Sequence, residues 1–463
     1  MMWTHLRNVC LVCAGLLTWL LALPPATAEP AWRVGVARVA ITPDTPLWMA
    51  GYGSRTHEAN DQYTELWVRT CALEDSAGAR AVLVACDLVG IDRTLARAVC
   101  ASLEQRCKLR RNEVALCFSH THSGPVVGRN LEPLHYRLLS AEQQQRVDAY
   151  AESLQQRILD CVDQALNDLQ PCELVWGSGT ATFAVNRRNN PEAQVPELRA
   201  AGQLQGPSDH DVPVLAARRP DGSWKAVVLG YACHSTVLDH YFWCGDYPGF
   251  AVAELETRVP GCTALFWAGC GADQNPLPRR TLPLAQEYGS QLAQAVGAVL
   301  ADDGQLQTLS ATLRTAYQEV PLPLDEIPTR EQLEQAAQGS DRYQQARAAM
   351  ALERLAAGTE LPATYPYPVQ VWVLGDQVQM VFLGGEVVVD YALRLKTELR
   401  GKQTWVAGYA NDVMAYIPSR RVLAEGRYEG RDAMVYYGIC GVWNPSVEQL
   451  IVDAVQTLVR SPQ

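Results

Sequence analysis

The sequence predicts a single large domain of the α/β class, in which mixed β-sheets are flanked by helices. Short β-type runs alternate with helical patterns along the chain, which is typical of this class. The 463 residues are 48% hydrophobic, which is enough apolar material to bury a large core. No internal repeat and no linker rich in Gly and Ser divides the chain, so we expect one domain over residues 29–463.

The first 28 residues predict a cleaved signal peptide. Arg7 precedes an apolar run from Val9 to Leu23, and Ala26-Thr27-Ala28 fits a signal-peptidase site. The alternative is a retained membrane anchor, although the run is shorter than the ~20 residues that a span needs. We therefore expect a secreted or periplasmic protein whose mature chain starts near Glu29.

The expected strands are apolar runs, and the expected helices carry helical periodicity or start signals. The strands are Trp32–Ile41, Leu66–Leu73, Ala81–Cys86, Val114–Phe118, Val212–Ala217, Ala226–Ala232, Ala264–Trp267, Val369–Leu374 and Val378–Leu383. The helices are 140–169, opened by the capping box Ser140-Ala-Glu-Gln143, then Ala285–Leu300, Arg330–Ala356 and Ser446–Val459. Prolines bracket a polar helical stretch in Pro321–Pro366, which predicts an insertion or lid over residues 321–366.

Charge and cysteine content exclude some classes of partner and site. A net charge of −11 argues against binding nucleic acid through bulk charge. We expect a small-molecule or lipid substrate, and peripheral membrane contact stays open. The cysteines beyond the predicted signal contain no C-x-x-C, which argues against a zinc ribbon. Cys262 and Cys270 are one candidate disulfide pair, whereas Cys86, Cys117 and Cys233 lie in apolar runs typical of buried thiols.

Two histidines, His120 and His122, follow the expected strand Val114–Phe118 in the segment "HTHSGP". If the strand continues, their side chains point to the same face, because side chains alternate along a strand. Strand ends collect ligands in α/β proteins, and histidine is the commonest metal ligand. The pattern indicates a metal ligand beside a second histidine, and two hydrogen-bonded surface histidines are the alternative.

Two further strand ends carry candidate ligands. His234 follows the apolar run that begins at Val227, and Glu386 follows Phe382-Leu-Gly-Gly. Each residue could instead have a structural role. His234 could be a buried histidine with hydrogen-bond partners, and Glu386 could cap a helix that starts at Val387. Aromatic residues of Tyr409–Arg420 and Arg427–Gly430 are dense enough to line a pocket, or to pack in the core.

These motifs together resemble the neutral/alkaline non-lysosomal ceramidase family. The resemblance runs from Gly35–Pro43 and Met49–Tyr52 to the Tyr416–Tyr428 region, and its most specific motif is "HTHSGP", His120 to Pro125. It implies one zinc ion, Zn²⁺, held by four residues: His120, His234 of "ACHST", Glu386 of "GGE" and Tyr416 of "AYIPS".

The same resemblance implies roles for neighbouring residues. His122 becomes the acid/base or orienting histidine, Arg187 of "VNRRNNP" a substrate-binding arginine, and Tyr428 of "RYEG" a residue on the oxyanion side. Three aspartates in family-like motifs, expected to be structural or outer-sphere, are Asp87, Asp246 and Asp273.

The chain departs from the family pattern in two places. Asn275 of "ADQNP" stands where ceramidases carry the serine of Gly-Asp-x-Ser-Pro, and a carboxamide is a poor nucleophile. The C-terminal immunoglobulin-like domain of the family is not expected here. We therefore expect a zinc amidohydrolase of an N-acyl amide, ceramide or a related lipid, in which zinc-activated water attacks and Asn275 assists. Alternatives are hydrolysis of another amide or ester, and a non-catalytic binding protein, against which the retention of all four ligand types argues.

Overall fold

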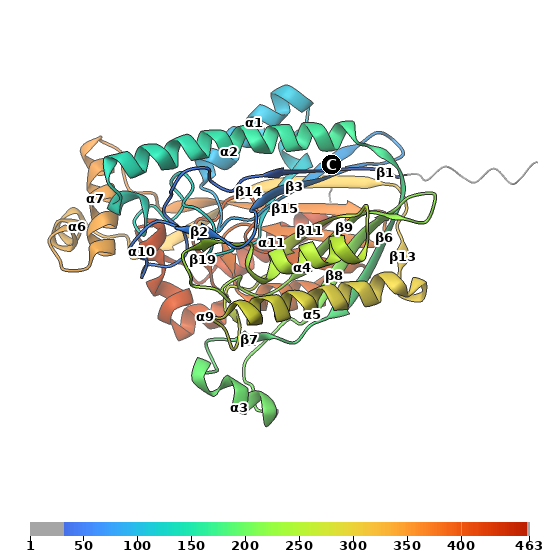
Figure 1. Cartoon of the computed structure of the whole chain (residues 1–463). Helices are drawn as coiled ribbons and strands as arrows, with labels where there is room; N and C mark the ends of the chain where they lie inside the picture. The colour runs from blue at the N-terminus through green and yellow to red at the C-terminus, as the bar shows by residue number, and fades with distance from the viewer. Residues whose placement is uncertain (1–31, 400, 461–463) are drawn as a thin grey trace, which may run out of the picture.

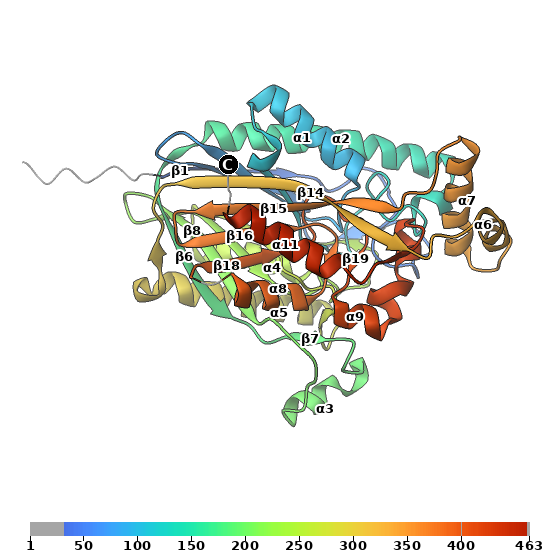
Figure 2. The same ribbon diagram turned by 180° about the vertical axis from the view of Figure 1, so that it is seen from behind.

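The computed structural model describes residues 32–399 and 401–460, so the predicted signal peptide lies outside the described residues. Two large sheets pack face to face between outer layers of helices (Figures 1 and 2). The chain is a single α/β domain of mixed sheets, as the sequence predicted.

The larger sheet has nine strands in the order β11-β9-β8-β6-β1-β3-β4-β5, with β13 paired to β6. Its pairs β4–β5 and β9–β11 are parallel and the rest are antiparallel. The strands are β1 Trp32–Ala40, β3 Trp67–Glu74, β4 Arg80–Cys86, β5 Val114–Phe118, β6 Gln170–Thr180, β8 Asp211–Arg218, β9 Trp224–Tyr231, β11 Thr263–Ala268 and β13 Gln307–Thr308.

The second sheet has five strands in the order β18-β16-β15-β14-β20. These are β14 Leu313–Asp325, β15 Thr364–Leu374, β16 Val378–Leu383, β18 Gln403–Ala407 and β20 Val442–Trp443. Three two-stranded ladders complete the sheets: β2 Asp61–Gln62 with β10 Phe242–Trp243, β7 Ala184–Asn186 with β12 Gln274–Pro276, and β17 Glu386–Val387 with β19 Tyr416–Ile417.

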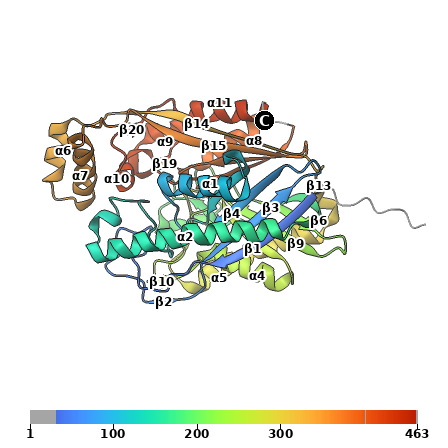
Figure 3. The same cartoon turned by 90° about the horizontal axis from the view of Figure 1, so that it is seen from above.

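Helices cover the outer face of each sheet (Figure 3). Against the larger sheet lie α2 Ala141–Asn167, α4 Asp246–Arg258 and α5 Leu282–Ala301, with α1 Arg93–Cys107 against α2; against the smaller sheet lie α8 Val389–Glu398 and α11 Val447–Arg460. The remaining helices are α3 Val195–Ala200, α6 Arg330–Ala337, α7 Arg342–Ala356, α9 Arg420–Glu425 and α10 Met434–Tyr437. Within the described residues, no helix combines the length and the hydropathy that crossing a bilayer requires.

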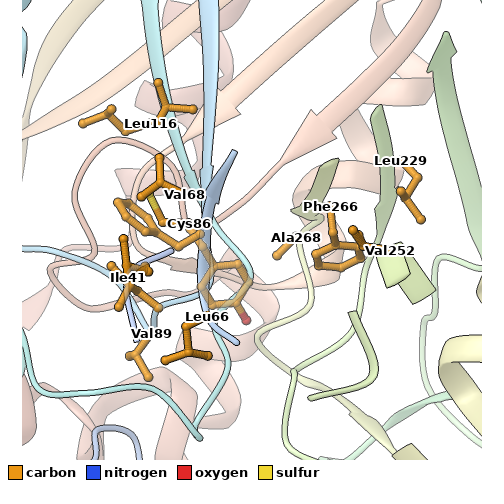
Figure 4. Packing of buried hydrophobic residues seen from close by; sticks show 14 of the residues in the cluster. Ile41, Leu66, Val68, Cys86, Val89, Leu116, Leu229, Val252, Phe266 and Ala268 are labelled. Carbon is orange, nitrogen blue, oxygen red and sulfur yellow. The ribbon is translucent and has the colours of Figure 1, made fainter. Parts of the chain in front are cut away.

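The strands of the larger sheet are apolar on both faces because both faces are buried. In β11, Phe266 belongs to the core beneath the helices, near Val252 of α4 (Figure 4), whereas the next residue, Trp267, points to the second sheet. There Trp267 stacks on Trp405 of β18, with ring centroids 4.4 Å apart, and on Phe382 of β16, at 4.7 Å. This aromatic stack joins the two sheets.

All nine expected strands are present, whereas one expected helix is divided in two. The predicted helix Arg330–Ala356 is two helices, because Asp341 starts α7 afresh by accepting hydrogen bonds from the amides of Tyr343 and Gln344. The predicted insertion 321–366 begins and ends inside strands, since Pro321 of β14 pairs with Pro366 of β15. Helices α6 and α7 lie between these strands in the sequence, at one end of the molecule (Figure 3).

The candidate disulfide between Cys262 and Cys270 is wrong, because all cysteines of the described chain are free thiols. The two residues flank β11, and a strand of this length keeps its ends about 20 Å apart. Disulfide-bonded residues have Cα atoms within about 7 Å. Cys86, Cys117 and Cys233 are buried thiols, as expected.

The packing of α2 on β1 predicts that Gly35 tolerates no side chain. A β-carbon there would lie 1.9 Å from the carbonyl oxygen of Ala165 in α2. Gly35→Ala should lower the free energy of unfolding by about 1–3 kcal/mol, measured by denaturant unfolding. Gly297→Ala in α5, where nothing lies within 4 Å, is the matched control and should stabilise the protein by up to ~1 kcal/mol. Equal stability of the two variants would contradict the packing.

Candidate active site

Three buried histidines and one glutamate converge at the ends of strands from the two sheets. Ligand atoms of His120, His122 and His234 all lie within 4.8 Å of one another. Oε2 of Glu386 lies 3.3 Å from Nε2 of His120 and 3.1 Å from Nε2 of His234. His120 and His122 follow β5, His234 follows β9, and Glu386 follows β16.

The two histidines of "HTHSGP" meet by a route that the sequence did not predict. The expected extended continuation of β5 is wrong, because the strand ends at Phe118 and His120 has a left-handed φ of 57°. The His120 amide donates to the carbonyl of Leu88, which holds this turn beside the end of β4. The two side chains nevertheless come together, with 3.2 Å between their Nε2 atoms.

Backbone carbonyls set the tautomers of two histidines. Nδ1 of His120 lies 2.7 Å from the carbonyl oxygen of Val89, and Nδ1 of His234 lies 2.8 Å from that of Gly271. A carbonyl only accepts, so each Nδ1 carries the proton and each Nε2 presents a lone pair. Burial, and then the charge of Arg187, lower the pKa of His234 to about 4, which keeps this imidazole neutral.

The donor set fits a divalent metal. In the tautomers set by these carbonyls, the Nε2 lone pairs of His120 and His234 both face the carboxylate oxygen of Glu386 in a buried space. A cation at their meeting point would satisfy all three groups. Neutral imidazoles and a carboxylate are common zinc ligands, and histidine ligands typically donate their other ring N–H to a carbonyl.

Glu386 reaches the histidines from a short ladder and does not cap a helix. It lies opposite Tyr416 in the parallel pair β17–β19, and the cap residue of α8 is Val388. Gly385 before it has a φ of +73°, and a β-carbon there would lie 2.7 Å from the carbonyl oxygen of Ala415. The second glycine of "GGE" is therefore required by backbone geometry.

Arg187 links the remaining predicted residues. Its guanidinium donates to Oδ1 of Asn275 and to the hydroxyl of Tyr416, both at 3.2 Å, and Glu429 accepts from its Nε at 2.8 Å. The ring of Tyr428 lies 5.3 Å from that of Tyr416, centroid to centroid. All eight predicted site residues are thus brought together, and their individual roles stay predictions.

A cavity of about 580 Å³ opens onto this group. Five predicted residues line it: His122, Arg187, Asn275, Tyr416 and Tyr428. His120, His234 and Glu386 do not line the cavity. A molecule in the cavity would therefore contact His122, Asn275 and the candidate ligand Tyr416, whereas the other three candidate ligands lie behind the cavity wall.

Two tyrosines of the site were missed by sequence reasoning. The hydroxyl of Tyr437 donates to Oε1 of Glu386 at 2.5 Å, and the ring of Tyr409 lies 4.3 Å from that of His120. Tyr409 belongs to the aromatic segment that the sequence indicated as pocket-lining. No local pattern marks Tyr437, which reaches the site through the packing of α10.

The three aspartates of the family-like motifs hold backbone in place. Asp246 accepts from the amides of Val237, Leu238 and Tyr247, in the turn that follows His234. Asp273 accepts from the amide of Val389 and from Asn186, and Asp87 accepts from the amide of Trp67. These contacts are structural, as expected.

Comparison with known proteins shows the family and the fold of this chain. Residues 32–268, just over half of the chain, match the family model described as neutral/alkaline non-lysosomal ceramidase, N-terminal. The structure resembles neutral ceramidase from Pseudomonas aeruginosa with a TM-score of 0.70 and 22% identity, covering 94% of this chain and 75% of that one. It also resembles a ceramidase complexed with C2, with a TM-score of 0.70 and 18% identity, over 94% and 76% of the two chains. The similarity in fold and the match over residues 32–268 show that this chain belongs to the neutral/alkaline non-lysosomal ceramidase family.

Proposed function

We propose that the protein is an exported, zinc-dependent amidohydrolase that cleaves the amide bond of an N-acyl substrate, ceramide or a related N-acyl lipid. The observation that carries this proposal is the convergence of two Nε2 lone pairs and a carboxylate behind a cavity with hydrogen-bonding side chains. Membership in a ceramidase family supports a hydrolase of amide bonds. Export rests on the predicted signal peptide, residues 1–28, and N-terminal sequencing of the mature protein tests it.

His120, His234 and Glu386 are the residues that would hold zinc, with the hydroxyl of Tyr416 as the fourth group. When bound, zinc supplies Lewis-acid chemistry, which polarises an amide carbonyl and lowers the pKa of water to about 7. Tyr437 orients the Glu386 carboxylate through its hydrogen bond to Oε1.

His122 differs from the two other histidines in a way that suits proton transfer. No carbonyl of the described chain holds either of its ring nitrogens, and Nδ1 has no hydrogen-bond partner there. No backbone carbonyl therefore sets the tautomer of His122, whereas carbonyls set those of His120 and His234. Amide cleavage requires a proton for the departing amine nitrogen, and His122, on the cavity wall, donates it.

Asn275 assists as a hydrogen-bond donor and not as a nucleophile. Its Oδ1 already accepts from Arg187, so its amide nitrogen is the group left to face a substrate. This N–H stabilises the carbonyl oxygen as negative charge develops on it. Water therefore attacks the carbonyl carbon directly, the C–N bond breaks, and no acyl group is carried by the protein.

The substrate class is tested by a screen of N-acyl sphingoid bases, N-acyl amino acids and acetylated sugars, combined with metal analysis. Cleavage of only esters or acetylated sugars would replace the proposed substrate while keeping the site. A metal-loaded protein that cleaves none of these amides and esters would favour the non-catalytic alternative.

Metal content tests the ligand assignment. The purified protein should hold roughly one zinc per chain, and His120→Ala and His234→Ala should each lose it, because each removes one of few ligands. Metal analysis by mass spectrometry, with circular dichroism as the control for folding, makes the measurement. Full zinc in both folded variants would exclude this site.

The variant His122→Ala tests whether His122 is a proton donor or a zinc ligand. As a donor, its removal should leave the zinc content unchanged and lower turnover by roughly 10²–10⁴. Zinc content and kcat are measured on the same preparation. Loss of zinc from this variant would make His122 a ligand and contradict the assigned role.

Asn275→Ala should lower turnover by about 10²–10³ without abolishing it, because one oxyanion donor is lost. Asn275→Ser tests whether the family's serine supports ceramide cleavage in this cavity. Rapid-quench kinetics of the native protein should show no acyl burst, and mass spectrometry no adduct at Asn275. A trapped acyl group there would refute direct attack by water, and full activity of Asn275→Ala would make the residue structural.

A further inference from the structure

The cavity in front of the candidate metal ligands is positively charged, although the chain as a whole carries a net charge of −11. Five guanidinium groups and two carboxylates line it: Arg187, Arg188, Arg279, Arg280, Arg427, Glu192 and Glu429. Among the lining residues of the described chain, Leu277 is the one aliphatic side chain apart from Pro191. An excess of guanidinium groups over carboxylates suits an anionic group.

Four of the five arginines have carboxylate partners. Arg187 and Arg188 both pair with Glu429, Arg279 pairs with Glu192, and Arg280 pairs with Asp239. These ion pairs neutralise most of the charge of the paired arginines and hold their side chains in place. Among the lining arginines of the described chain, Arg427 alone has no carboxylate partner, and Arg280 is paired at the solvent-exposed edge of the cavity.

Arg427 is exposed and has no hydrogen bond or ion pair with any residue of the described chain. The side chain of Arg280 is 46% exposed and pairs with Asp239 through Nη1. Both guanidinium groups therefore keep N–H donors free for a ligand. A guanidinium presents these donors in a planar fork that matches carboxylate and phosphate oxygens.

The backbone at both arginines is held in an unfavourable conformation. Arg280 has a φ of 85° and Arg427 a φ of 63°, in the left-handed region that residues with side chains seldom adopt. Their loops are fixed, because Arg280 donates its amide to the carbonyl of Val237 and Arg188 donates to that of Gly426. Strain retained at two cavity-lining arginines is typical of a binding site.

We infer that the cavity selects N-acyl amides that carry an anionic group, a carboxylate or a phosphate, beside the scissile bond, and that Arg427 and Arg280 bind this group. The inference rests on the proposed amidohydrolase activity and narrows its substrate class. A neutral ceramide offers no charge to the free guanidinium donors of this cavity.

Matched substrate pairs test the inference. An N-acylglycine and its neutral N-methylamide form one pair, and ceramide 1-phosphate and ceramide form the other, so the two pairs distinguish carboxylate from phosphate. The native protein should favour the anionic member of at least one pair by roughly tenfold or more in kcat/KM. Added salt should reduce this preference, because it screens exposed charges.

Substitutions of Arg427 and Arg280 test whether these two residues cause the preference for anionic substrates. Arg427→Gln and Arg280→Gln should each raise KM for the anionic substrate, roughly tenfold, with kcat and the neutral substrate changed little. Arg431→Gln, an exposed arginine of the same segment that pairs with Glu326 and does not line the cavity, is the control and should leave the preference intact. Equal use of the neutral members, or an unchanged preference in both cavity variants, would overturn the inference.

Equilibrium binding of the same compounds, by calorimetry, separates this inference from the proposed function. If no amide is hydrolysed, the proposed activity fails, while tighter binding of the anionic members that is lost in Arg427→Gln still supports the anion site. If both members of a pair are hydrolysed and bound alike, the activity stands and the anion site fails.

Discussion

The packing of the two sheets against each other is the interaction on which the site depends. His120 and His234 follow strands of the nine-stranded sheet, whereas Glu386 follows β16 of the five-stranded sheet. The imidazoles and the carboxylate meet only if the sheets hold one relative position. The stack of Trp405, Trp267 and Phe382 fixes that position by dense aromatic packing, in which a small shift costs many contacts.

Backbone carbonyl and amide groups also hold the site residues in place, and no sequence pattern marks these groups. Val89 and Gly271 orient two histidines through their carbonyl oxygens, and the amide of His234 donates to the carbonyl of Gln274. Asn275, the next residue, lies in β12 opposite Val185 of β7. One short ladder therefore places a candidate oxyanion donor and the candidate substrate-binding Arg187 at the same wall.

The sequence predicted most residues of the candidate site, but few of the contacts that bring them together. Runs such as Val114–Phe118 and Val378–Leu383 were predicted with their observed bounds, because buried strands are continuously apolar. The strands β6 and β14 were missed, since Gly, Pro and polar residues interrupt their apolar pattern. The left-handed turn at His120 and the approach of Tyr437 to Glu386 depend on contacts between distant segments, which no local pattern encodes.

The free cysteines have a consequence for how the protein is made. All of those described are unpaired, all but Cys107 are buried, and burial raises the pKa of Cys71 to about 12, so this thiol does not ionise at neutral pH. The thiolate is the form that undergoes disulfide exchange. The described fold therefore contains no disulfide, and its formation needs neither an oxidant nor a disulfide isomerase. Recombinant production in a reducing cytoplasm should give the same folded domain as production in an oxidising compartment.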